Sequence, residues 1–426
     1  MIQKGIVVTL IFIFSTLIQL VSQILVTRIF GASLNLDIFL AAVAVPTLVV
    51  TMIYATVNDA FLPLYGHEKA TNAKHADDFF FSHLLILTGL SLVIALIASF
   101  AADTLSNLLY NSRGVAFVSA VSLQMRYMFF SLPLAVLATL LGSYYYSQKD
   151  FIRFPIAQMI GSMANLVIIV LLYPHIGIWA LVIAFVINLA IQILFVIPGK
   201  IVHMSFVNIN IWPFFAAFVP LIIGAFAVRS DTLLIRSFGA QLPAGSLVYL
   251  NLITKILSIS TSILTVGIQV LLLPHLVEYI SHKNYDKAIQ NVHKAKIIAV
   301  MISVVVSIAV LLLGPFMIQL LFVGGKFTQA DASMTSSLLP YFLIPAIGWG
   351  INSVFAQPLI ALKKQKELSI LHVSALGVSW GSAWLANIYL GALAAIVVGL
   401  ILLLFIGIIG SEILWQHYKK TLVRSA

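Results

Sequence analysis

Residues 299–314 read AVMISVVVSIAVLLLG, a continuous apolar run that contains no charged side chain. Another such run, LSLVIALIASFAA, occupies residues 90–102. About 20 apolar residues make a helix long enough to span the hydrocarbon core of a bilayer, whereas the strands of a membrane β-barrel alternate apolar and polar residues. These runs therefore predict an all-α polytopic membrane protein.

The overall composition agrees with a chain that lies mostly in lipid. Of its 426 residues, 62% are hydrophobic and 8% are charged, and the mean hydropathy is +1.11. Soluble domains carry about 25% charged residues. This difference excludes a soluble globular enzyme, a nucleic-acid-binding domain and a disordered chain. The chain has no cysteine, so neither disulfides nor thiol chemistry can contribute.

Apolar segments separated by short polar ones predict about twelve transmembrane helices. The expected spans are residues 6–27, 37–62, 79–101, 118–147, 152–173, 176–197, 213–235, 245–275, 295–322, 334–361, 367–387 and 389–415. The longest polar stretch, residues 277–296, is compatible with a short surface helix.

Basic residues indicate how the helices are oriented. With the N-terminus in the cytoplasm, alternation of the spans places most lysines and arginines in cytoplasmic loops. The outside loops hold Arg28, Arg113, Arg236 and Lys326. This bias follows the positive-inside rule and predicts a multi-pass protein with both termini in the cytoplasm. It also accounts for most of the net charge of +10, so no nucleic-acid partner is needed.

An internal repeat relates the two halves of the chain. The pattern R-x-F-G-A begins at Arg28 in the first half and at Arg236 in the second, and further similarities follow in order at a nearly constant offset. We therefore predict two parallel six-helix lobes, residues 1–200 and 201–426, around a central cavity. Transporters with repeated halves bind substrate between them and alternate access by rocking.

Polar side chains recur every three or four residues on some predicted helices, and this spacing places them on one face. The candidate cavity-lining residues are Gln19, Gln23, Asn251, Ser258 and Ser262. Small polar residues also join membrane helices by packing, so both explanations stay open for a single stripe. The stripe on the eighth span also carries Lys255, which favours a hydrated cavity there.

Charged side chains within the spans are the sharpest indication of a site, because each costs about 2.5–3.5 kcal/mol on insertion scales. The candidates are Asp59, Arg126, Arg229, Asp231 and Lys255. Snorkelling to a nearby surface would also explain Asp59 and Arg126. Asp231 either forms a structural ion pair with Lys255, or tunes or couples a cationic site for an anionic substrate.

Motifs for catalysis are missing from the sequence. It contains no G-x-x-x-x-G-K-[ST] phosphate loop and no H-E-x-x-H pattern, and its few acids are dispersed. We therefore expect a transporter rather than an enzyme, with no ATPase, metal or cofactor. A gradient of substrate, ions or voltage would drive it.

Four segments resemble the MurJ-type lipid II flippases (MviN family), which belong to a superfamily that includes the MATE exporters. They are RIFGASLNLDIFLAAVAVP (28–46), DAFLPLYGHEK (59–69), TKILSISTSILTVGIQVLLLP (254–274) and FVGGKFTQADASMT (322–335). The resemblance implies a bacterial inner-membrane flippase for an undecaprenyl-pyrophosphate-linked precursor of peptidoglycan. It also implies that membrane lipid and cell-wall synthesis proteins are partners.

The resemblance also implies site residues, because cavity arginines hold the diphosphate in that family. Lys255 falls at the position of one of these arginines, and Asp37 at that of the acid after the first loop. The substrate-binding candidates are thus Lys255, Arg229, Arg28, Asp37 and Arg126. Arg28, which matches Arg236 in the repeat, is alternatively a structural residue at the outer end of its lobe.

The chain departs from the family in two ways. Three other cavity arginines are replaced, by Thr16, Ser22 and Val50, and the expected spans are about two fewer than the family carries. Two alternatives to a flippase are therefore kept, a MATE-like small-molecule exporter and a transport-inactive membrane scaffold.

Overall fold

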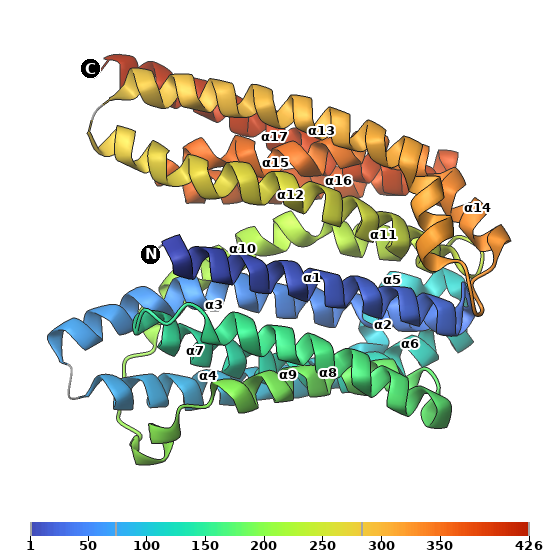
Figure 1. Ribbon diagram of the computed structural model, residues 1–426, viewed down its shortest axis with the longest axis horizontal. Helices are drawn as coiled ribbons and strands as arrows, with labels where there is room; N and C mark the ends of the chain where they lie inside the picture. The colour runs from blue at the N-terminus through green and yellow to red at the C-terminus, as the bar shows by residue number, and fades with distance from the viewer. Residues whose placement is uncertain (1, 73–74, 283, 425–426) are drawn as a thin grey trace. The chain divides into compact units, whose positions relative to one another are not determined.

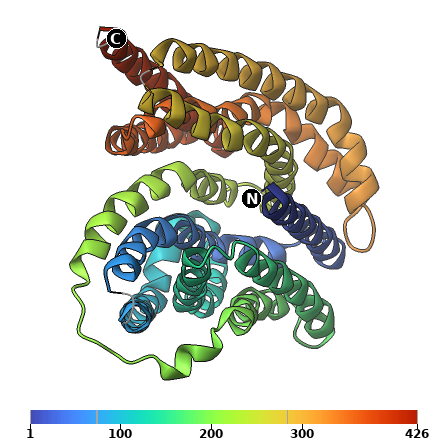
Figure 2. The same cartoon turned by 60° about the vertical axis from the view of Figure 1, so that its left-hand side comes forward.

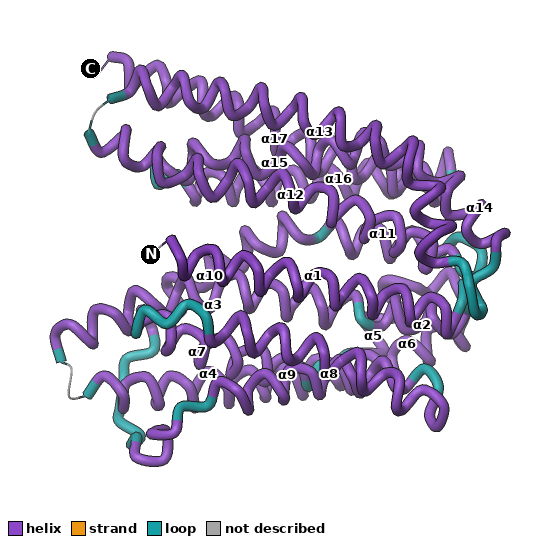
Figure 3. Tube along the Cα trace, viewed as in Figure 1, coloured by secondary structure: helices purple, strands orange, loops and turns teal. Residues whose placement is uncertain are grey.

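Helices account for almost all of the computed structural model, which describes residues 2–72, 75–282 and 284–424 (Figures 1 and 3). Within these ranges, bridged extended backbone is limited to one isolated pair, Gly324 with Phe327. The all-α class predicted from the sequence is therefore confirmed. The chain divides into two compact units, Met1–Phe226 and Ala227–Ala426. The lobe boundary expected at residue 200 stays a prediction.

The first unit consists of helices joined mostly by short turns, with a longer connection between α9 and α10 (Figure 2). Its helices are α1 (Ile2–Phe30), α2 (Leu34–Ala42), α3 (Ala44–Thr71), α4 (Ala76–Phe100), α5 (Ala102–Tyr110), α6 (Val115–Met128), α7 (Ser131–Ser147), α8 (Arg153–Ile176), α9 (Trp179–Val196) and most of α10 (Trp212–Arg229). Two 3-10 turns, Asn111–Arg113 and Gly199–His203, connect neighbouring helices.

Helix α7 forms the centre of the first unit, because it packs against α3, α4 and α9 and buries nearly all of its length. Four aromatic rings meet around it: Phe61 and Tyr65 from α3, Phe80 from α4, and Tyr144. Their centroids lie 4.8–6.1 Å apart. Aromatic side chains bury large areas and favour such spacings, so this cluster stabilises the packing of the three helices.

Four expected spans each consist of two helices, which corrects the single helices predicted for residues 37–62, 118–147, 213–235 and 334–361. The breaks fall at residue 43, residues 129–130, residue 230 and the 3-10 turn Leu339–Phe342. Three of the helices that follow carry a proline at their third residue, namely Pro46, Pro133 and Pro345. Proline is tolerated in the first turn of a helix but disfavours helical backbone just before it, so these prolines begin new helices.

The second unit begins with the last residues of α10. It continues through α11 (Asp231–Gly239), α12 (Ser246–Ser281), α13 (Tyr285–Phe322), α14 (Gln329–Leu338), α15 (Leu343–Ala361), α16 (Gln365–Leu390) and α17 (Ala392–Arg424). Residues 277–296 are not a separate surface helix, because α12 runs through Ser281 and α13 starts at Tyr285.

Close packing in the second unit depends on small residues. Helices α16 and α17 lie against each other, and α11 packs on α17. A Cβ atom at Gly399 of α17 would lie 2.6 Å from Leu234 Cδ1 of α11 and 3.0 Å from Ala383 Cβ of α16. The Ser379 hydroxyl of α16 donates to the Gly399 carbonyl at 2.7 Å. Small residues permit this close approach of helices in lipid.

Eleven helical spans in the described part of the chain are long and apolar enough to cross a membrane, where α2 with α3, α6 with α7 and α14 with α15 each count as one span. Within α12, the shorter stretch Ser246–Ser258 is also apolar. Many large apolar side chains are exposed, for example Val93, Ile94 and Ile97 of α4. Such exposure suits lipid as the surrounding solvent. The chain is therefore a multi-pass membrane protein, as the sequence predicts.

Candidate functional site

A polar stripe follows one face of α12 in the second unit. Asn251, Lys255 and Ser258 are four and three residues apart, so they share this face. Asn251 and Lys255 are half-buried, and Ser258 is exposed. The Ser258 hydroxyl donates to the Lys255 carbonyl at 2.8 Å. Ser262, expected in the same stripe, falls among residues whose side chains lie outside the description.

Arg236 of α11 brings a second cation to this stripe. Its Nη2 donates to Asn251 Oδ1 at 2.8 Å, and Asn251 lies one helical turn from Lys255. From the sequence, the repeat motif favours a structural role for Arg236 at the outer end of its lobe. The structure places its guanidinium beside the α12 stripe, which therefore has two cations close to it.

Asp231 begins α11 and ties this helix to α15. Its Oδ2 accepts a hydrogen bond from Trp349 Nε1 at 2.9 Å, and its Oδ1 accepts one from the Thr232 backbone N–H at 2.7 Å. Acidic groups are favoured in the first turn of a helix, where the backbone N–H groups have no helical partner. Asp231 thus has hydrogen-bond partners on α11 and α15, while the ion pair with Lys255 that the sequence suggests stays a prediction.

Arg229 is the last residue of α10 and is separated from Asp231 by the break at Ser230. Its side chain is exposed, whereas the neighbouring Ser230 is buried. A cation at the C-terminal end of a helix is favoured by the helix dipole. Arg229 therefore has a structural reason for its position as well as a possible role toward an anion.

In the first unit, Asp37 has a partner of its own. This residue of α2 has 1% of its side chain exposed, and its Oδ2 lies 3.7 Å from Arg113 Nη2. The Arg113 guanidinium also lies over the Phe117 ring, 5.0 Å from its centroid. An ion pair inside one unit argues for a structural contribution from Asp37. Arg28, also expected to bind substrate, lies half-buried in the last turn of α1.

Arg126 and Asp59 both have exposed side chains. Arg126 forms an ion pair with Asp103, and both side chains are exposed. A hydrogen bond from Ser122, together with the charge of Arg126, holds the pKa of Asp103 below its ordinary value. Asp59 is exposed on α3. These positions agree with the snorkelling alternative.

Helix α1 carries Gln19 and Gln23, whose role in lining a cavity stays a prediction. Gln19 is exposed, and Gln23 Nε2 donates to the Thr27 hydroxyl of its own helix at 3.3 Å. The helix packs on α8, where Phe30 and Tyr173 make an edge-to-face contact at 5.1 Å. The α1 stripe is thus partly satisfied within its own helix.

Sequence reasoning missed a chain of polar side chains inside the first unit. The Tyr54 hydroxyl of α3 donates to Gln192 Oε1 of α9 at 3.0 Å, and Gln192 Nε2 donates to Asn188 Oδ1 at 2.7 Å. Gly161 of α8 leaves room for these amides, since a Cβ there would lie 2.6 Å from Asn188 Oδ1. Two amides four residues apart in the otherwise apolar segment 179–196 are the signal that would have found them.

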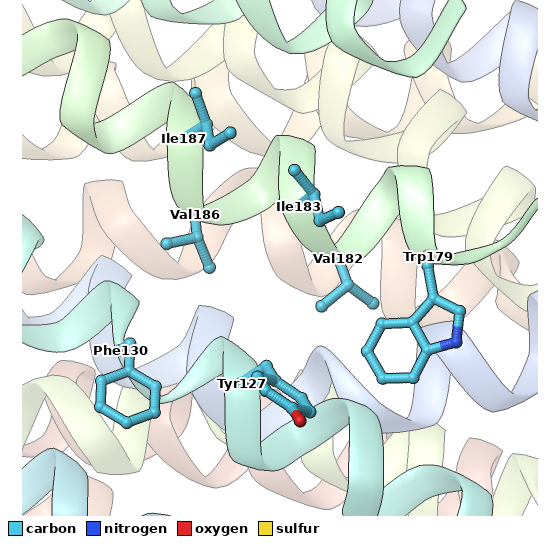
Figure 4. A pocket seen from close by; sticks show the side chains of 7 residues that line it. All are labelled: Tyr127, Phe130, Trp179, Val182, Ile183, Val186 and Ile187. Carbon is cyan, nitrogen blue, oxygen red and sulfur yellow. The ribbon is translucent and has the colours of Figure 1, made fainter. Parts of the chain in front are cut away.

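The first unit also contains an apolar groove between the end of α6 and α9 (Figure 4). It has a volume of about 560 Å³ and is lined by Tyr127, Phe130, Trp179, Val182, Ile183, Val186 and Ile187. Tyr127 and Trp179 meet edge to face at its rim, with centroids 5.5 Å apart. Such a lining suits a hydrocarbon chain and offers little to a charged headgroup.

Side chains that could hold a metal ion do not cluster in the described part of the chain. No group of three or more His, Cys, Asp or Glu side chains there is placed to hold a metal ion.

Solved structures share this fold. One described as "Lipid II flippase MurJ, inward closed conformation" superposes with a TM-score of 0.82 at 19% identity, over 97% of this chain and 87% of that one. An inward-facing multidrug resistance MATE transporter gives a TM-score of 0.77 at 16% identity, over 96% of both chains. At these identities the comparison shows a common fold.

Relatives identified by sequence agree with the comparison of structures. The "Probable lipid II flippase MurJ" of Helicobacter pylori strain ATCC 700392 / 26695 is 24% identical over 154 residues, 36% of this chain and 33% of that protein. The chain thus matches about a third of the length of that relative. The protein of the same description from Buchnera aphidicola is 23% identical over 381 residues, 84% of this chain and 73% of that protein.

The family assignment rests on a match over nearly the whole chain. The family model described as "Lipid II flippase MurJ" matches residues 26–423, which include most of both units, Lys255 and Arg236. Members of this family are membrane transporters, not enzymes, and their fold is the one found here. This chain therefore belongs to the MurJ lipid II flippase family.

Proposed function

We propose that this protein moves a lipid-linked anionic glycan precursor, lipid II or a related undecaprenyl-pyrophosphate-linked precursor, across the bacterial cytoplasmic membrane. It works by alternating access, in peptidoglycan biosynthesis. The observation that carries the proposal is the α12 stripe, where Lys255 and the Arg236–Asn251 pair share one end of the second unit. The family match over residues 26–423 supports it.

The chemistry of a diphosphate fits this stripe. A diphosphate carries several anionic oxygens, and charged donors bind such oxygens more strongly than neutral ones do. Lys255 offers a point charge with three donors, and Ser258 and Asn251 offer neutral polar groups on the same face. Lysine lacks the planar fork of arginine, so we expect it to hold the diphosphate less rigidly.

A lipid-linked substrate also has a long hydrocarbon chain. The apolar groove between α6 and α9 is lined by rings and branched aliphatic side chains, which suit an isoprenoid. We propose that the groove takes part of this chain. Two features of the protein thus correspond to the two chemical parts of the substrate.

We propose that Asp231 holds α11 in position beside this site. Its carboxylate binds Trp349 of α15 and the first turn of α11, the helix that carries Arg236. A change in its protonation would weaken both bonds and alter the seating of α11, which is one way to couple a proton to movement of the cationic residues.

The orientation proposed from charge is that both termini face the cytoplasm, because most lysines and arginines then fall in cytoplasmic loops. The likeness to a MATE transporter favours a second candidate function, export of small molecules. Organic cations would be repelled by Lys255 and Arg236, so this candidate predicts transport that improves when Lys255 is neutralised.

The decisive experiment is rescue of cells depleted of their own lipid II flippase. Wild type, Lys255→Ala and Arg229→Ala would be compared at equal expression, with Lys294→Ala, an exposed lysine of α13, as the matched control. We expect wild type and the control to rescue growth and Lys255→Ala to fail. Full rescue by Lys255→Ala would refute the assignment of the phosphate contacts to the α12 stripe, and full rescue by Arg229→Ala would exclude Arg229 as a further contact.

A leaflet-translocation assay in proteoliposomes separates the remaining candidates. A flippase moves a labelled lipid-linked precursor between leaflets, an exporter moves a small organic cation, and a scaffold moves neither. Failure of wild type to rescue, with translocation of another lipid-linked glycan in vesicles, would change the substrate and keep the mechanism.

A further inference from the structure

A polar pocket lies within the second unit, between the first turns of α13 and the last turns of α17. Its volume is about 520 Å³. The residues that matter for its chemistry are Lys287, His293 and Lys296 from α13, and Glu412, Trp415 and Lys419 from α17. None of these belongs to the α12 stripe or to the apolar groove.

Lys296 forms the floor of this pocket. Its side chain is 10% exposed and makes an ion pair with Glu412. Its Nζ also lies 4.8 Å from the centre of the Phe355 ring and 5.6 Å from that of Trp415. A charged side chain so well enclosed in a membrane helix is a functional hypothesis by default.

Glu412, the acid of this pair, has its partners within the pocket. Glu412 accepts from Lys296 and also from Gln416 Nε2, at 2.6 Å, so its charge is balanced inside the pocket. The other ionisable residues that line the pocket are Lys287, Lys419 and His293, together with one acid, Asp286. The pocket is therefore cationic toward an incoming ligand.

The arrangement suits a compact anion with several oxygens. Lysines from two helices line the pocket, Lys287 from α13 and Lys419 from α17, together with Trp415 of α17. Lysine ammonium groups are common phosphate ligands, and basic pockets between membrane helices bind anionic lipid headgroups. The volume falls within the range of small-ligand sites.

We propose that this pocket binds phosphate, carried either by the headgroup of an anionic lipid or by a free phosphate ion. The ligand would bridge α13 and α17 through Lys287 and Lys419 and rest against Trp415. This site is additional to the proposed substrate site, because it uses neither Lys255 nor Arg229.

Calorimetry tests the proposal by measuring how three probes bind to the full chain, purified in an uncharged detergent. The probes are dioctanoyl phosphatidylglycerol, dioctanoyl phosphatidylcholine and inorganic phosphate. The variant K287A/K419A removes both rim lysines, and K294A/K420A is the control. Lys294 and Lys420 are exposed on the same two helices and do not line the pocket, so the control loses equal charge.

We expect phosphatidylglycerol to bind at least tenfold more tightly than phosphatidylcholine, and this preference to disappear in K287A/K419A while the control keeps it. Binding of inorganic phosphate with the same dependence on the rim lysines would identify a free ion as the ligand; binding of the lipid alone would identify a headgroup. Equal loss in both double variants, or the absence of rim-lysine-dependent binding for both phosphatidylglycerol and inorganic phosphate, would overturn the proposal. The milder Lys419→Gln serves if the double variant unfolds.

Discussion

Replacement of Gly399 by alanine tests whether α11, and with it the candidate site, is held by close packing on α17. The alanine Cβ would lie 2.6 Å from Leu234 Cδ1 and 3.0 Å from Ala383 Cβ. Leu234 is fully buried and the Ala383 Cβ is fixed to its backbone, so neither can move aside easily. The structure therefore predicts overpacking at this position.

The expected magnitude follows from two opposing effects. Overpacking of a buried position costs roughly 1–3 kcal/mol, while replacing glycine by alanine within a helix gains roughly 1 kcal/mol. The net change is a destabilisation of about 1 kcal/mol, or a fall in melting temperature of about 2–4 °C for a unit of this size.

Thermal unfolding in detergent measures this change, with Gly377→Ala and Gly381→Ala as controls. Both control glycines lie in α16, and a Cβ at either position would meet nothing within 4 Å. They carry the same helix-propensity gain without the clash, so we expect them to leave the melting temperature unchanged or to raise it. A Gly399→Ala variant as stable as the controls would refute the packing argument.

A double-mutant cycle adds a second check. Leu234→Ala is destabilising by itself because it removes a buried side chain, but it also removes the atom that the new Cβ would meet. The two substitutions together should therefore cost less than the sum of the single ones, by about 1 kcal/mol. Additive effects would show that the two sites do not touch.

Three other outcomes are expected. Asp37→Asn should lower the melting temperature, because it leaves the half-enclosed Arg113 without its carboxylate, at a cost of about 1–3 kcal/mol; an unchanged melting temperature with lost transport would instead make Asp37 a substrate ligand. The pKa of the Asp103 carboxyl is lower in the folded protein than its ordinary value. The charged carboxylate therefore stabilises the fold above the ordinary pKa, and this stabilisation is lost as the pH falls through the lower pKa of the folded state. Melting temperatures of wild type and Asp103→Asn should therefore differ slightly near pH 7 and converge once the pH is below the pKa of Asp103 in the folded state, and a gap that persists there would contradict this. Val186→Trp should fill the apolar groove and reduce transport of a lipid-linked substrate, whereas Leu194→Trp, at an exposed position of the same helix outside the groove, should not.

The sequence predicts the fold class well because lipid imposes one dominant rule, continuous apolar helices. It predicts the breaks in these helices less well. Pro46, Pro133 and Pro345 are visible signals, yet Pro220 lies inside the continuous α10 and the break at Ser230 has no proline. Whether a proline ends a helix depends on how neighbouring helices accept the freed backbone groups, and this is a property of the packing.

For the candidate site, the sequence identifies residue types but not their partners. Spacing alone places Asn251, Lys255 and Ser258 on one face, as found. It does not reveal that Arg236 binds Asn251 or that Asp231 binds Trp349, because those partners lie 15 and 118 residues away along the chain. Lys296 lies at the end of the polar stretch 277–296, where the sequence gives no sign of burial, whereas α13 begins at Tyr285 and encloses it.

The two copies of the repeat motif serve different structural purposes. In the first copy, Gly31 has a φ of +64° and provides the left-handed turn after α1. In the second, Gly239 permits close packing instead, since a Cβ there would lie 2.7 Å from Leu250 Cδ1 and 3.0 Å from Leu247 Cδ2 of α12.

This difference bears on which unit contributes cations to the proposed substrate site. Close contact of α11 with α12 lets Arg236 reach Asn251, one turn from Lys255, so the second copy adds a cation to a polar stripe. In the first unit, the acid that follows the motif, Asp37, is instead paired with Arg113. The residues at the two copies of the motif thus have different neighbours, a paired acid in the first unit and an additional cation beside a polar stripe in the second. Charge-neutralising substitutions at Lys255 or Arg236 should consequently impair anion binding more than the equivalent change at Arg113, which would act through stability.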